Sequence, residues 1–456
     1  MQNETRQAAL AAPELLLAPE WTLLPEGPAQ GLGVVVRDGV FADIGPLVEL
    51  SARHPHLQPV ALPQRLLMPG FVDAHHHLTQ SFGKALAFGE PSEIFRRIWV
   101  PLEGSLDAHA LYLSAKLAAL EALRGGFTTV CDAGARNSAA LQAIEQAASE
   151  AGIRCVLGMI CHDEAALAGA DRFLARRAPL LHPALAVAIP EAVDNALLHA
   201  TSRLAAEAGA VFQVHVNEHL ASVERSLVAR GQRPLQHLHA AGALGPQALL
   251  AHCTMLTPDE MLLLRDSGTA VAINPVASPW KGNAVAPSEL LAALGVRLGM
   301  GTDGTRSDGF RMMDAAESNQ RLAFGLASGD SVCGGGHLWL DMATRGGADA
   351  AGLSALTGQV AVGRAADFLL IDLDVPELTP SWDLRWELVR LASRAQIESV
   401  HVQGRLRLWQ GWPVDWDGRA LLQEVREVAR ERVARAPIHK VQPLAASTMK
   451  VALHRD

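Results

Sequence analysis

Four segments of the chain carry histidine or carboxylate side chains directly after short apolar runs. These segments are residues 73–77, 215–218, 251–253 and 301–304. The first contains His75 and His77, whose side chains point to the same side of an extended segment because side chains alternate with a period of two. Both imidazoles can therefore reach one cation. We interpret this segment as part of a metal site, although a solvated loop is the ordinary alternative.

The other segments are weaker signals when each is taken alone. A single histidine such as His215 on an apolar strand is usually a satisfied core residue, and an aspartate before glycine, such as Asp303, is usually a turn former. Together, however, the segments would bring three histidines and a carboxylate to one rim if each ends a strand of the same sheet. We predict that His75, His77, His215 and Asp303 hold one divalent cation.

Such a site has the parts of a hydrolytic centre. A Zn²⁺ ion with an open position lowers the pKa of its bound water to about 7, so hydroxide is available at neutral pH. Glu218 is suited to carry a proton from water to a departing nitrogen, and Asp303 is able to accept the water proton. We expect His252 to orient the water and to stabilise developing oxyanion charge.

The elements that must position these residues form an alternating pattern. Short β-rich runs alternate with stretches of helical periodicity, and this alternation predicts a parallel sheet. The runs are residues 66–73, 128–132, 155–160, 185–189, 211–216, 249–252, 270–274 and 298–302. The helix candidates are residues 107–124, 138–151, 194–208, 258–267 and 312–326. About eight units favour a distorted (β/α)8 TIM barrel, whose active sites lie at the carboxyl ends of the strands; an open doubly wound sheet is the alternative.

The two ends of the chain have a different pattern. Residues 15–24, 33–44, 366–373 and 400–409 are strand-like, and Asp38-Gly39 marks a hairpin turn. We therefore predict a small composite β-sandwich, with a C-terminal tail, from residues 1–65 and 358–456. The metal-dependent hydrolase barrel would then occupy residues 66–357.

The composition argues against several classes of protein. The chain has 456 residues, a net charge of −9 and no run of Lys or Arg, so a nucleic-acid partner is not expected. No apolar run approaches the length of a membrane span, and residues 1–9 lack the features of a secretory signal. Five scattered cysteines without a CxxC pair argue against a disulfide framework and a thiolate zinc site. A cytoplasmic enzyme without a membrane partner is the expectation.

The motifs in this order resemble the amidohydrolase superfamily, in the branch of cytosine, guanine and S-adenosylhomocysteine deaminases that also contains the s-triazine hydrolases. The resemblance covers nearly the whole chain. It rests on residues 69–77 (PGFVDAHHH), 215–218 (HVNE), 251–253 (AHC), 301–304 (GTDG), 343–348 (ATRGGA) and 363–367 (GRAAD).

The resemblance implies a barrel with a composite β-sandwich, one catalytic metal ion, and hydrolytic loss of ammonia from an aminated heterocycle. Zn²⁺ is the expected metal and Fe²⁺ the alternative, and a homodimer or larger homo-oligomer is a family-level expectation. Two-metal branches use a carboxylated lysine near the fourth strand. Residues 185–191 contain no lysine, which favours a single ion.

Departures from the branch bear on the substrate. Nucleoside deaminases of the branch usually carry a PHAPYT segment after the fourth strand, whereas residues 189–193 read IPEAV, which disfavours a nucleoside. The start HHHLTQ is similar to that of 8-oxoguanine and isoxanthopterin deaminases, and it makes Gln80 a candidate to bind a lactam edge. Trp99, Trp280 and Arg306 are further candidates to line a pocket for a flat ring, although core packing or surface placement is the commoner fate of each.

The hypothesis is therefore an aminohydrolase acting on a small aminated oxo-heterocycle of the purine, pterin or pyrimidine kind. The alternatives are an s-triazine-type hydrolase that removes chloride or an alkylamine, a nucleoside deaminase of the adenosine or S-adenosylhomocysteine type, and a catalytically silent metal-binding relative. A cytidine-type zinc deaminase is rejected because its H-x-E and P-C-x-x-C segments do not occur. We interpret His76, between the two predicted ligands, as structural or solvated.

Overall fold

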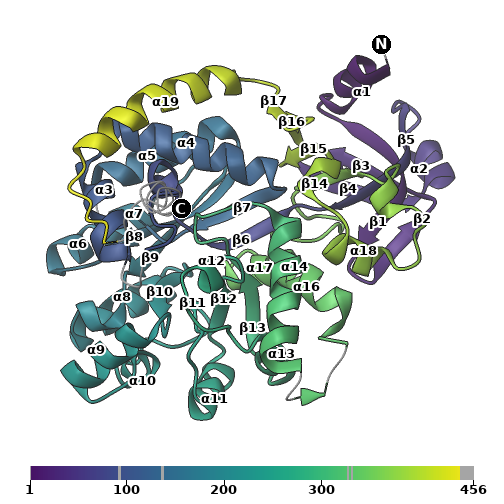
Figure 1. The fold of residues 1–456 in the computed structure, drawn as a ribbon. Helices are drawn as coiled ribbons and strands as arrows, with labels where there is room; N and C mark the ends of the chain where they lie inside the picture. Colours follow the sequence, from purple (N-terminus) through teal and green to yellow (C-terminus); the bar gives the residue numbers. More distant parts are fainter. Residues whose placement is uncertain (1, 91–93, 135–137, 326–327, 330–331, 442–456) are drawn as a thin grey trace, which may run out of the picture.

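An eight-stranded parallel barrel forms the centre of the molecule (Figure 1). The computed structural model describes residues 2–90, 94–134, 138–325, 328–329 and 332–441. The barrel strands are β6 (Phe71–His76), β7 (Phe127–Asp132), β8 (Arg154–Ile160), β9 (Leu181–Val187), β10 (Phe212–Val216), β11 (Ala248–His252), β12 (Ala270–Ile273) and β13 (Arg297–Met300). They pair in chain order, and β13 lies beside β6, so the expected (β/α)8 barrel is confirmed.

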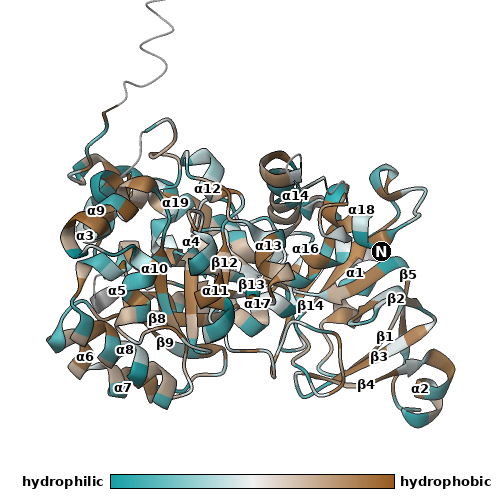
Figure 2. Ribbon diagram, turned by 90° about the horizontal axis from the view of Figure 1, so that it is seen from below, coloured by the Kyte–Doolittle hydropathy of each residue, from teal (hydrophilic) through white to brown (hydrophobic). Residues whose placement is uncertain are grey.

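Helices follow most of the strands and surround the barrel. The main ones are α4 (Ala108–Arg124), α5 (Ser138–Ala151), α8 (Asn195–Glu207), α9 (Leu220–Arg230), α10 (Pro234–Ala240), α11 (Pro258–Ser267), α13 (Ser288–Ala293), α14 (Gly309–Gln320), α16 (Gly335–Ala343) and α17 (Arg345–Ala350). Several begin at a side chain that accepts a backbone hydrogen bond, such as Asp107 before α4 and Thr257 before α11. The strands are largely buried and apolar, as the brown colouring of Figure 2 shows, because helices cover the outside of the sheet.

The N- and C-terminal segments build one nine-stranded mixed sheet beside the barrel, seen on the right of Figure 1. Its strands are β1 (Leu15–Leu24), β2 (Gly27–Gln30), β3 (Leu32–Arg37), β4 (Val40–Pro46), β5 (Pro59–Pro69), β14 (Phe368–Asp372), β15 (Ile397–Val402), β16 (Arg405–Trp409) and β17 (Trp412–Pro413). The two ends of the chain meet where β5 pairs with β14 in antiparallel orientation. The predicted joining of the two chain ends is confirmed.

The prediction of one strand over residues 66–73 is wrong. The chain divides at Gly70, so residues up to Pro69 belong to the mixed sheet and the barrel begins at Phe71. A Cβ atom at Gly70 would lie 2.2 Å from the Thr128 side chain, so only glycine allows this close approach. The apolar pattern is continuous across the division because both sheets bury their strands.

The long helix α19 (Gly418–Arg435) returns from the mixed sheet to the barrel and packs against α4 (Figure 1). In the described part of the chain, no helix has the length and apolar character needed to cross a membrane.

Candidate metal and catalytic site

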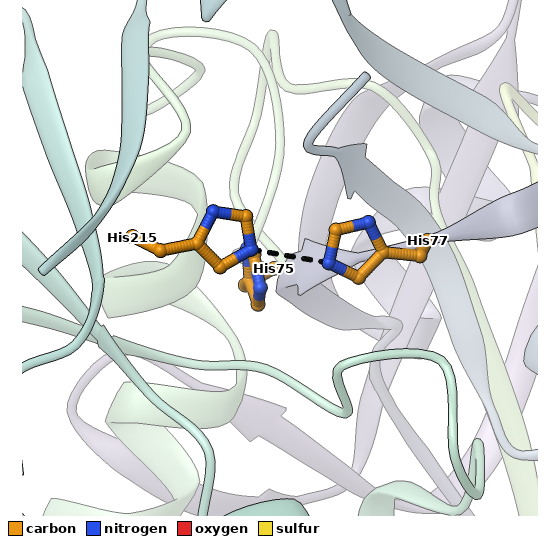
Figure 3. Close-up of side chains that lie close together, drawn as sticks. All are labelled: His75, His77 and His215. Carbon is orange, nitrogen blue, oxygen red and sulfur yellow. Dashed lines mark hydrogen bonds between the residues drawn. The ribbon is translucent and has the colours of Figure 1, made fainter. Parts of the chain in front are cut away.

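Three histidines meet at the carboxyl ends of β6 and β10. Figure 3 shows the rings of His75, His77 and His215 turned toward one another. The Nε2 atoms of His77 and His215 lie 3.2 Å apart, and the ring centres of His75 and His215 lie 4.7 Å apart. The alternation of side chains along β6 brings His75 and His77 to the same side, as their spacing predicts.

Asp303 reaches the same point from the loop after β13. Its Oδ1 atom lies 3.5 Å from Nε2 of His75 and 3.3 Å from Nε2 of His77. The backbone of Asp303 has a φ of +57°, a strained conformation for a residue with a side chain, and its N–H donates to the carbonyl of His75 at 2.9 Å. The tertiary structure therefore brings together the four predicted ligands.

The arrangement fits a divalent cation. One ligand atom from each of His75, His77 and His215 lies within 4.8 Å of the others, and the same holds for His75, His252 and Asp303. The Nε2 atom of His75 is buried and has no hydrogen-bond partner among the described residues. Nδ1 of His215 is 2.7 Å from the carbonyl of Ala188, which leaves its Nε2 lone pair directed at the cluster. These donors are those that Zn²⁺ prefers.

The protonation states suit metal binding. Burial lowers the pKa of His77 and holds that of His215 well below the ordinary value, so both rings are neutral at pH 7. Burial alone would raise the pKa of Asp303, but the ammonium group of Lys281 and the nearby rings of His75 and His77 hold it well below its ordinary value. Neutral imidazoles and an ionised carboxylate are the forms that coordinate a metal.

Glu218 and His252 flank the cluster. Nε2 of His252 is 3.8 Å from Oε2 of Glu218, and Nδ1 of His252 lies 3.0 Å from Nδ2 of Asn274. Burial lowers the pKa of His252 to about 4, so its ring is neutral at pH 7. Because Asn274 donates to Nδ1, the ring proton of the neutral imidazole lies on Nε2, where it faces the site.

Sequence reasoning missed three residues that contact the site. Lys281 donates to Glu218 and to Asp303, and Asn274 holds the ring of His252. Asp73 accepts hydrogen bonds from the backbone and hydroxyl of Thr302 and lies 3.0 Å from Nδ1 of His76. For Lys281 and Asn274, the only signal was their place after the seventh barrel strand, on the rim where the ligands lie. His76 is buried, and its Nδ1 atom contacts Asp73 and the hydroxyl of Thr302.

A cavity of about 840 Å³, counting the part open to solvent, leads to these groups. The predicted substrate-binding residues Gln80 and Trp99 line it, together with Glu218 and Asp303. Trp280 instead packs in an apolar cluster with Ile98, and Arg306 is exposed; neither of these two predicted residues lies among those that line the cavity.

The chain is similar to known proteins in both sequence and structure. A 5-methylthioadenosine/S-adenosylhomocysteine deaminase of Nitratidesulfovibrio vulgaris is 30% identical over 87% of this chain and 92% of its own length. One of Syntrophobacter fumaroxidans is 28% identical over 90% of this chain and 95% of its own. Among solved structures, a zinc-bound adenosine deaminase from Xanthomonas campestris superposes with a TM-score of 0.84 at 25% identity, covering 92% of this chain and 98% of that one.

A guanine deaminase of E. coli has the same fold, with a TM-score of 0.75 at 19% identity over 87% of this chain and 99% of that one. The sequence pattern of the Amidohydrolase family matches residues 66–407. This range spans the entire barrel and continues through β14 and β15 into β16 of the mixed sheet. The chain therefore belongs to the amidohydrolase family, and this match together with its deaminase-named relatives supports a hydrolase that acts on carbon–nitrogen bonds.

Proposed function

We propose that this enzyme is a metal-dependent hydrolytic deaminase that removes ammonia from an aminated, oxo-bearing heterocycle of the purine kind. The observation that carries the proposal is the placement of Glu218 and His252 beside three clustered imidazoles and Asp303. A purely structural metal ion needs neither Glu218 nor His252 next to it. The deaminase names of relatives that cover most of the chain support the same reaction.

We propose that His75, His77, His215 and Asp303 hold one Zn²⁺ ion. The ion, when bound, supplies a Lewis acid that makes hydroxide available near neutral pH. This ligand set is the one predicted from the sequence. It is supported by the burial of His75, His77 and Asp303 and by the close approach of all four side chains.

The protein's own residues then carry out proton transfer, charge stabilisation and substrate binding. Burial alone would raise the pKa of Glu218, but its interactions with the nearby His252 ring and with the ammonium group of Lys281 outweigh burial and hold the pKa below its ordinary value. Glu218 is therefore ionised at pH 7, accepts a proton from the attacking water and delivers it to the departing nitrogen. His252 donates a hydrogen bond from its Nε2–H to the negative charge that develops on the substrate. Gln80 and Trp99 hold the ring, the first by an amide that both donates and accepts and the second by its face.

Two substrate classes compete. The relatives named for methylthioadenosine and S-adenosylhomocysteine favour an adenosine-type nucleoside. The departure of residues 189–193 from the nucleoside pattern favours a free base. In this segment Glu191 accepts a hydrogen bond from Ser222 at 2.7 Å and does not line the cavity. An s-triazine hydrolase remains a third candidate, because a triazine hydrolase shares the fold with a TM-score of 0.78 at 21% identity.

The experiment is a panel of paired substrates offered to the zinc-loaded enzyme: guanine, 8-oxoguanine and isoxanthopterin, adenosine and 5-methylthioadenosine, and chlorinated or aminated triazines. Release of ammonia from a base but not from a nucleoside would support the free-base class, and the reverse result would support the nucleoside class. Release of chloride or an alkylamine from a triazine would replace the proposal with the third candidate.

The variant Glu218→Gln tests the mechanism on the best substrate. Loss of the proton carrier should lower kcat by about 10²- to 10⁴-fold. Glu224→Gln on the exposed side of α9 is the matched control and should keep the wild-type rate. No release from any substrate, or a wild-type rate for Glu218→Gln, would contradict the proposal.

A further inference from the structure

Lys281 lies between the two carboxylates on which the proposed chemistry depends. It follows the short helix α12 (Ala277–Trp280), and its side chain is 12% exposed. Its Nζ atom is 3.0 Å from Oε1 of Glu218 and is also paired with Oδ2 of Asp303. Asn283 approaches the same Oε1 atom at 3.4 Å. A buried lysine that bridges two acids is well satisfied, and this geometry fixes which oxygen of each acid remains for other partners.

The two oxygens of Asp303 face different partners. Oδ1 lies toward Nε2 of His75 and His77, at 3.5 and 3.3 Å, whereas Oδ2 lies toward Lys281. With Oδ2 occupied by the ammonium group, only Oδ1 is directed at the imidazole cluster. Asp303 is therefore presented as a ligand through one oxygen.

The two oxygens of Glu218 also face different partners. Oε1 accepts from Lys281, and Oε2 faces Nε2 of His252 at 3.8 Å. The oxygen on the His252 side is the one left for proton transfer. Without Lys281, the two carboxylates that line this cavity would repel each other, and Glu218 would be free to turn.

We propose that Lys281 is a positioning residue that holds one oxygen of Asp303 and one of Glu218, and that its fixed positive charge weakens metal binding while it keeps Glu218 in place for catalysis. The inference rests on the proposed function of the site. It predicts opposite effects on two measurable quantities, which an ordinary structural ion pair does not.

The test compares Lys281→Met, which removes the charge but keeps the length, with Lys281→Arg, which keeps the charge. Zn²⁺ affinity is measured by competition with a chromophoric chelator, and kcat and KM are measured on the best substrate. Removing a positive charge next to the cation should tighten Zn²⁺ binding by about tenfold or more in Lys281→Met. The loss of a positioning contact should lower kcat by about 10- to 100-fold. KM should change little, and Lys281→Arg should restore both quantities toward wild type.

Lys84 provides the matched control because it pairs with Glu121 outside the cavity. Lys84→Met should leave Zn²⁺ affinity and kcat unchanged. Unchanged or weaker Zn²⁺ binding in a folded Lys281→Met protein would overturn the inference, and so would an unchanged kcat. Lys281→Gln gives the same readings if the methionine variant does not fold.

The affinity measurement needs no substrate. If no substrate is found, tighter binding of Zn²⁺ by Lys281→Met would still support the charge effect of Lys281, so a failure of the proposed function is distinguishable from a failure of this inference.

Discussion

At the scale of single residues, the site holds neutral imidazoles and ionised carboxylates that are buried or partly buried. Burial disfavours every charged form. The histidines respond by losing their protons, as His215 and His252 do. The carboxylates of Glu218 and Asp303 stay ionised because the neighbouring histidines and the ammonium group of Lys281 between them outweigh burial. The protonation states therefore depend on partners from several distant segments.

The contact between Asn274 and His252 leads to a prediction about the tautomer of His252. In Asn274→Asp the carboxylate would accept from Nδ1, so the ring proton would move away from the Nε2 atom that faces Glu218. We expect kcat to fall by about 10- to 100-fold with little change in KM. Steady-state kinetics of the zinc-loaded enzyme measure this effect.

Asn319→Asp is the control for that variant, because Asn319 donates to the carbonyl of Pro275 and is not among the residues that line the cavity. It should keep the wild-type kcat. If both variants lose activity equally, the tautomer argument fails.

At the scale of elements, the decisive junction lies between β6 and β13, the first and last strands of the barrel. Asp73 on β6 accepts from the N–H of Thr302 at 2.9 Å and from its hydroxyl at 2.5 Å. Gly301 allows the close approach, since a Cβ there would lie 2.7 Å from Cβ of His75. This junction places Asp303 beside His75, so strand closure and metal binding depend on the same contacts.

Removal of Asp73 should therefore affect both stability and metal affinity. Asp73→Ala leaves the buried polar groups of Thr302 and His76 without this partner, which should destabilise the protein by about 3–5 kcal/mol. The same change should weaken Zn²⁺ binding by at least about tenfold, since supporting contacts of a metal site are worth about 10- to 100-fold in affinity. Urea unfolding and chelator competition measure the two effects.

Thr302→Val is the graded comparison because it removes the hydroxyl contacts with Asp73 and with Nδ1 of His76 and keeps the backbone contact. It should cost about 1 kcal/mol for each hydrogen bond lost and leave Zn²⁺ affinity close to that of the wild type. Wild-type Zn²⁺ affinity in Asp73→Ala would contradict the role given to the junction.

At the scale of the whole molecule, the mixed sheet ties both ends of the chain to the barrel. Arg154 on β8 is buried and pairs with Asp367 at 3.0 Å, and Asp367 also accepts from Thr357 and from the backbone of Gln403. His401 on β15 is completely buried and stacks on Phe368 with ring centres 4.1 Å apart. Polar groups buried at this depth make the stability of the molecule depend on pH.

Burial lowers the pKa of His401 to about 3, whereas an unfolded histidine titrates near 6.5. Below pH 6.5 the unfolded chain takes up a proton at this histidine, whereas the folded protein does not. The contribution of His401 to the free energy of unfolding is therefore fully present above pH 6.5 and decreases as the pH drops toward 3. In the wild type this effect lowers the free energy of unfolding by roughly 1 kcal/mol per pH unit between pH 6 and pH 4. His401→Gln should abolish this decrease. Urea unfolding at several pH values measures the difference in slope.

The exposed His162 is the control for this experiment. His162→Gln should follow the wild-type dependence on pH. Parallel curves for the wild type and His401→Gln would show that His401 does not supply the effect.

Much of the barrel was predictable because its signals are local. The helices α5 and α11 have the predicted bounds, since apolar periodicity and end signals lie within each segment. The division at Gly70 was not predictable, because β5 and β6 are both buried and their apolar pattern runs on without a break. The placement of Trp280 away from the cavity was also beyond reach, since an aromatic residue suits a core and a pocket equally well.

The sequence by itself determined which residue types were available and the pairing of His75 with His77, because the spacing of two residues acts within one strand. It also determined the alternation of strands and helices, through the period of the apolar residues. Only the tertiary structure decided that Lys281 bridges Glu218 and Asp303, that Asn274 orients His252, and that Asp73 joins β6 to β13. These contacts link segments distant in the chain, and their geometry follows from closure of the barrel. Local sequence patterns cannot predict them because such patterns act only within one segment.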